Sequence, residues 1–64
     1  MVDRAKQYYE KGVNFARLDQ YADAISCYDK ALEINPGYAM AWFNKGFALG
    51  EFTFFGVAGD GEKR

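Results

Sequence analysis

The chain has 64 residues, 50% of them hydrophobic, with six Phe, five Tyr and one Trp, and a formal net charge of −1. A chain of this length forms one small domain at most, and so much aromatic surface is typical of a sequence that folds. The balanced charges provide no basic field for nucleic acid or anionic lipid, so we expect neither as a partner. With no His and with Cys27 as the single Cys, the sequence predicts no metal site, no cofactor and no intrachain disulfide.

The N-terminal segment, residues 1–12, carries charges where a secretory signal would need an apolar run. No apolar stretch approaches the ~18 residues of a membrane-spanning helix. We therefore expect a cytoplasmic protein that does not enter the membrane.

Two amphipathic helices are predicted before Pro36. Asp3 can cap the first helix, whose apolar side holds Tyr8, Gly12, Phe15 and Ala16 at helical spacing. After a turn at residues 17–20, the apolar side of the second helix holds Tyr21, Ala24, Ile25, Tyr28, Ala31 and Leu32. Pro36 disfavours helical backbone at Asn35 and lacks a donor itself, so the second helix should end there. A third helix should start near Tyr38 or Ala39.

The third predicted helix repeats the first with an offset of 34 residues. The offset places Ala5 on Ala39, Tyr8 and Tyr9 on Trp42 and Phe43, Lys11 and Gly12 on Lys45 and Gly46, and Phe15 on Leu49. Identities, paired aromatics and a glycine that agree in one register indicate a duplicated helical unit.

This period and these residues resemble the tetratricopeptide repeat, over residues 3–51. The family's small and large positions fall on Tyr8, Gly12, Phe15, Tyr21, Ala24, Tyr28, Ala31 and Pro36 in the first repeat, and on Trp42, Gly46 and Leu49 in the second. The chain departs from the family at Lys11 and Lys45, where an apolar residue is usual, and at Asp19, where glycine is preferred. The resemblance implies an all-α fold, an antiparallel helix–turn–helix followed by a third helix that starts a second repeat.

We expect a single domain over 1–64, with the first repeat at 3–36, the first helix of the second repeat at 37–51 and an atypical tail at 52–64. Glycine is dense in this tail, and so are aromatics. One alternative is that the third helix continues to about Phe55 and ends at Gly56. The other is that the tail folds back, extended, over the face that a fourth helix would cover.

The resemblance also implies a binding groove, because the first helix of each repeat in this family lines a concave surface that holds a peptide. The partner-binding residues expected on this basis are Tyr9, Val13, Met40, Phe43, Asn44 and Phe47. Aromatic residues at helical spacing more often belong to the core, which is the competing role for Tyr9, Met40, Phe43 and Phe47. Of the Lys, Asn and Arg set with which some relatives grip a carboxylate terminus, only Asn44 is matched, so apolar or aromatic ligands are expected.

No catalytic site is predicted. Cys27 lies within a helix and no His is present to activate it, while the carboxylates are spread along exposed helical positions. We therefore expect a non-catalytic interaction module that binds a protein, a peptide or a second copy of itself. An uncovered apolar surface at Trp42, Leu49, Phe52 and Phe55 favours a homodimer. The alternative is that the chain is a fragment, a frame-altered relic or an engineered piece of a longer array, without a function of its own.

Overall fold

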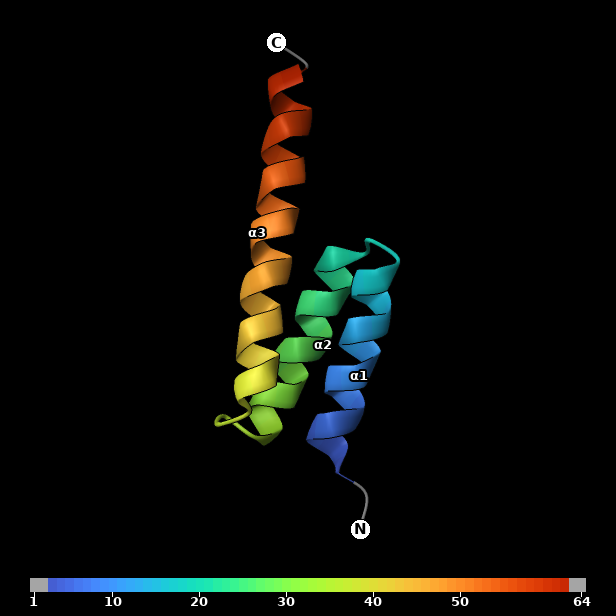
Figure 1. Cartoon of the computed structure of the whole chain (residues 1–64), viewed down its shortest axis with the longest axis vertical. Helices are drawn as coiled ribbons and strands as arrows, with labels where there is room; N and C mark the ends of the chain where they lie inside the picture. Colours follow the sequence, from blue (N-terminus) through green and yellow to red (C-terminus); the bar gives the residue numbers. More distant parts are fainter. Residues whose placement is uncertain (1–2, 63–64) are drawn as a thin grey trace.

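The computed structural model describes the backbone of residues 3–62 and the side chains of residues 3–54. Three helices follow one another, α1 (Arg4–Arg17), α2 (Tyr21–Ile34) and α3 (Ala39–Glu62), and these residues contain no strand. α1 and α2 form an antiparallel pair, and α3 packs along α2 before extending beyond both (Figure 1). The expected all-α class is confirmed, and so is a third helix that starts at Ala39.

Local chemistry explains where the first two helices begin and end. The Asp3 carboxylate accepts a hydrogen bond from the backbone N–H of Lys6 at 3.1 Å, which caps α1. Between α1 and α2, Asp19 has a φ of 60°, the left-handed conformation for which the family prefers glycine. Asp tolerates this conformation, and its carboxylate accepts a hydrogen bond from the Tyr21 hydroxyl at 3.1 Å. The turn therefore forms without glycine.

The core consists of small residues around one large ring. Ala24, Tyr28 and Ala48 form one buried cluster, and Ala31, Leu32 and Ala41 form a second. Tyr28 is the largest fully buried side chain among the described residues. Alanines on α2 and α3 let the helix backbones approach closely, and Tyr28 fills the space beside them.

The C-terminal half of α3 differs from both expected alternatives. The helix continues past Phe55, as the first alternative required, but it does not end at Gly56 and stays helical to Glu62. The alternative of an extended tail that folds back is also wrong, because this segment is helical. A continuous helix satisfies the backbone donors and acceptors within the segment, which offsets a helix penalty of about 1 kcal/mol for each glycine. The side chain of Phe55 lies outside the described residues.

Candidate partner-binding site

The exposed side of α3 carries two rows of apolar residues. We call Met40, Phe43 and Phe47 the groove face, and their exposed fractions lie between 56% and 74%. We call Trp42, Gly46 and Leu49 the open face, where Trp42 is 53% and Leu49 is 43% exposed. Ala41 and Ala48, which are buried, mark the side of the helix that packs against the core. The two exposed faces therefore flank the packed side of α3.

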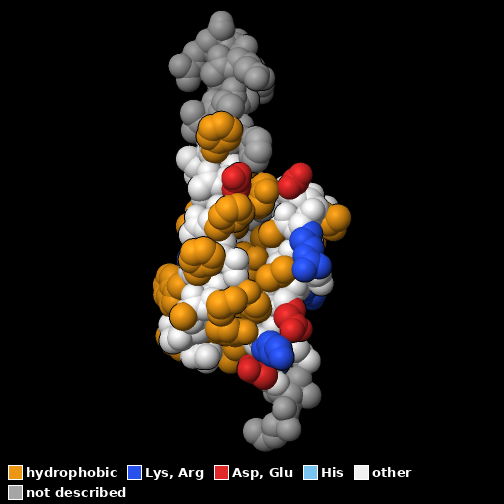
Figure 2. All heavy atoms as spheres, viewed as in Figure 1, with side chains coloured by type: hydrophobic (Ala, Val, Ile, Leu, Met, Phe, Trp, Pro, Cys, Tyr) orange, Lys and Arg blue, Asp and Glu red, His pale blue; other side chains and the backbone are white. Residues whose placement is uncertain are grey.

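Apolar surface gathers over α3 more than over the rest of the molecule. Figure 2 shows hydrophobic side chains along α3 and along the seam beside it, while the charged side chains in this view lie mostly towards α1. Phe52, one turn beyond the open face, is 51% exposed, and Phe54, two turns beyond the groove face, is 66% exposed. Such a contiguous apolar surface is typical of a site that another polypeptide covers.

The six residues predicted for the groove divide into two groups. Met40, Phe43 and Phe47 are exposed, whereas Tyr9, Val13 and Asn44 are partly buried. Val13 packs on the cluster around Tyr28. The exposed three are available to a ligand, whereas Tyr9 and Val13 pack against the core and Asn44 bonds to Tyr9.

Tyr9 and Asn44 join α1 to α3. The Asn44 amide donates hydrogen bonds to the Tyr9 hydroxyl at 2.7 Å and to the Met40 carbonyl at 2.9 Å. The Tyr9 ring lies 5.9 Å from the ring centre of Tyr28 and 5.2 Å from that of Tyr38. These contacts fix the side of α3 on which the groove face lies. Sequence reasoning placed both residues near the groove but gave no signal that they bond to each other.

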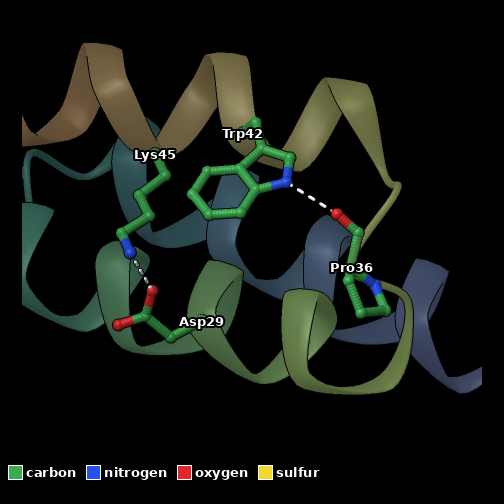
Figure 3. A network of polar contacts seen from close by, with 4 residues as sticks. All are labelled: Asp29, Pro36, Trp42 and Lys45. Atoms are coloured by element: carbon green, nitrogen blue, oxygen red, sulfur yellow. Dashed lines mark hydrogen bonds and ion pairs between the residues drawn. The ribbon is translucent and has the colours of Figure 1, made fainter.

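Trp42 is held in place by a polar network (Figure 3). Its indole N–H donates to the Pro36 carbonyl at 2.7 Å, and the Lys45 ammonium lies 5.4 Å from the ring centre. The same ammonium forms an ion pair with Asp29 of α2 at 2.6 Å. Lys45, which departs from the family pattern, thus ties α3 to α2 and contributes a cation–π contact. This role was missed, because only the fold brings Lys45 and Asp29 together.

The ionisable groups give little support to chemistry at this surface. Burial raises the pKa of the Cys27 thiol above its ordinary value, so the thiol is protonated at neutral pH. The described residues contain no group of three His, Cys, Asp or Glu side chains that could hold a metal ion. Within the same part of the chain, no helix combines the length and the apolar character that a membrane crossing requires.

Comparisons with known proteins identify the helical unit. Two models described as tetratricopeptide repeat match the chain, over residues 5–38 and residues 27–53. No solved structure matches significantly.

Curated relatives extend the comparison. An uncharacterized protein of Methanocaldococcus jannaschii is 42% identical over 48 residues, which cover 75% of this chain and 56% of that protein. The small glutamine-rich tetratricopeptide repeat-containing protein beta of Homo sapiens is 34% identical over 55 residues, which cover 81% of this chain and 18% of that protein. The chain thus spans only part of each of these two relatives. From the helix pair, the 34-residue register and these matches, the chain belongs to the tetratricopeptide repeat family, with about one and a half repeats.

Proposed function

We propose that this chain is a non-catalytic, cytoplasmic interaction module that binds another polypeptide through the apolar faces of α3 and self-associates as a homodimer. The observation that supports it most directly is the exposure of seven large apolar side chains on the part of α3 whose side chains are described: Met40, Trp42, Phe43, Phe47, Leu49, Phe52 and Phe54. The family to which the chain belongs is one of protein–protein interaction repeats. Covering such a surface removes apolar area from water, which favours association.

The charge distribution supports a neutral, apolar partner. Between Ala39 and Gly50 the only charged residue of α3 is Lys45, and Asp29 neutralises it. A phosphate backbone or an anionic membrane would find no cluster of cations on this surface. The groove face suits an apolar or aromatic peptide for the same reason.

A second candidate is that this chain is part of a longer array, in which a further helix covers α3. It is favoured by the partial coverage of the archaeal and human relatives, 56% and 18% of their lengths. In that case the binding function belongs to the assembled array.

The molar mass of the reduced chain, measured by light scattering across a dilution series, tests the proposal. We expect a dimer that dissociates on dilution. The double variant Phe43→Asp/Leu49→Asp should remain a monomer, because each carboxylate would be buried without a partner. The matched control Ala22→Asp/Ser26→Asp adds the same charge on the exposed side of α2 and should dimerise like the original chain. A mass of one chain at every concentration would refute self-association.

A further inference from the structure

The packing around Gly12 shows why a glycine stands at this position of the repeat. A Cβ atom at Gly12 would lie 2.5 Å from Cε1 and 2.7 Å from Cδ1 of Tyr28, and 3.1 Å from the carbonyl oxygen of Ala24. On the same side of α1, Tyr8 and Phe15 are half-buried against the two core clusters. This side of α1 therefore packs against an antiparallel helix, α2, and the Tyr28 ring of that helix lies directly against Gly12.

Gly46 occupies the same register in α3 but has no such neighbour. Trp42 and Leu49 correspond to Tyr8 and Phe15, so the open face of α3 repeats the packed side of α1. Nothing lies within 4 Å of a Cβ atom placed at Gly46. Because α3 runs on to Glu62 without turning back, no helix within residues 3–62 covers this face. The open face has the shape of a helix-binding surface whose helix must come from elsewhere.

The chemistry of the open face favours a second α3 as that helix. The face needs an apolar helix with aromatic rings and without charge, because Lys45 beside it is already paired with Asp29. α3 meets this description, since from Ala39 to Gly50 it carries no other charged residue. Two identical helices that are related by a two-fold axis perpendicular to them are antiparallel. α2 packs on α1 in the same antiparallel orientation.

The available area is also sufficient. The exposed parts of Trp42, Phe43, Leu49 and Phe52 amount to roughly 100 Å² each, taking about half of the 150–250 Å² of a large side chain. In a standard interface each partner buries ~800 Å², of which about three fifths is apolar. The combined exposed area of these four side chains comes close to that apolar part.

We propose that the open face is completed in trans by the antiparallel α3 of a second copy, with an aromatic ring of the partner against Gly46. The inference rests on the self-association proposed above and specifies its geometry. Each copy supplies the other with the helix that its second repeat would otherwise pack against Gly46. Met40 and Phe47 of the groove face stay outside the contact and remain free for a peptide, while Phe43 lies at its edge.

Substitution of Gly46 tests the close contact. Ala and Leu have similar helix propensities, and in the single chain either side chain projects into open space. In the proposed dimer, Gly46→Leu should raise the dissociation constant roughly tenfold or more, through overpacking, and Gly46→Ala should raise it less. Ser26→Leu, which adds apolar bulk on the exposed side of α2, is the control and should not weaken the dimer. Circular dichroism checks that each variant keeps its helices.

Two further readouts fix the face and the orientation. Trp42 is the only Trp, so its emission should shift to shorter wavelength with dimerisation. In a Cys27→Ser background, spin labels at Ala39→Cys should lie roughly 20 Å from each other in an antiparallel pair centred on Gly46, while a parallel pair brings them to about 10 Å. A dimer that tolerates Gly46→Leu, leaves the Trp42 emission unchanged or gives the parallel distance would overturn this geometry and leave self-association standing. A chain that is monomeric throughout would overturn both.

Discussion

At the scale of single residues, the packing of α1 on α2 depends on the absence of a side chain at Gly12. Tyr28 is 2% exposed and its ring occupies the space that a Cβ atom would need. Ala24, whose carbonyl borders the same space, is fully buried. A large ring against a glycine thus sets the distance between the two helices. Gly50 also lies in a helix, but a Cβ atom placed there would have no neighbour within 4 Å.

We predict that Gly12→Ala lowers the free energy of unfolding by about 1–3 kcal/mol, because overpacking outweighs a gain of up to ~1 kcal/mol in helix propensity. Gly50→Ala is the matched control, and it should stabilise the chain slightly because only the propensity changes. Urea unfolding followed by circular dichroism measures both variants. A stabilised Gly12→Ala variant would show that the Tyr28 ring moves aside at little cost.

Residue-level packing was predictable from the sequence only where the repeat itself specifies it. The small and large positions at Gly12, Ala24 and Tyr28 follow from the helical spacing and the 34-residue register. The hydrogen bond between Asn44 and Tyr9 and the ion pair between Lys45 and Asp29 depend on how α3 lies against α1 and α2. Pairings of this kind join residues distant in sequence, so no local pattern indicates them.

At the scale of the helices, local signals indicated every boundary except the last. Asp3 caps α1, and Asn35, whose side chain accepts a hydrogen bond from the Gly37 N–H at 3.2 Å, supports the turn before α3. The predicted end of α3, at Gly56, came too early because the high density of glycine in the tail was taken as a signal that the helix ends. A glycine ends a helix when it adopts a left-handed conformation, and no glycine of the described backbone has a positive φ.

The cap of α1 gives a second prediction. Asp3→Ala should lower the free energy of unfolding by roughly 1 kcal/mol, because the N–H of Lys6 loses its side-chain acceptor. Asp3→Asn keeps an acceptor oxygen at the same place and should restore most of the stability. Urea midpoints of the three proteins provide the measurement, and equal midpoints would mean that water replaces the cap without cost.

At the scale of the whole molecule, stability should depend on pH above neutrality. Burial raises the pKa of Tyr28 and that of Tyr38 above the ordinary value. In the folded chain these hydroxyls therefore hold their protons more tightly than in the unfolded chain. Their contribution to stability is fully present below the unfolded pKa of about 10 and is lost as the pH rises through the folded pKa.

We predict that the free energy of unfolding falls as the pH is raised above about 10. Tyr28→Phe keeps the buried ring and removes the ionisable group, so this variant should show a shallower decline over the same range. Urea unfolding at several pH values between neutrality and pH 11 provides the comparison. Parallel declines in the two proteins would assign the pH dependence to other groups.

The length of α3 also governs how the molecule moves through solution. The chain measures 51 × 20 × 13 Å, and its radius of gyration of 13.0 Å exceeds the ~11 Å that scaling gives for a compact domain of this length. Friction on such a rod is higher than on a sphere of the same mass, so a single chain diffuses slowly and leaves a gel-filtration column early. An elution volume alone would therefore make one chain resemble a compact pair.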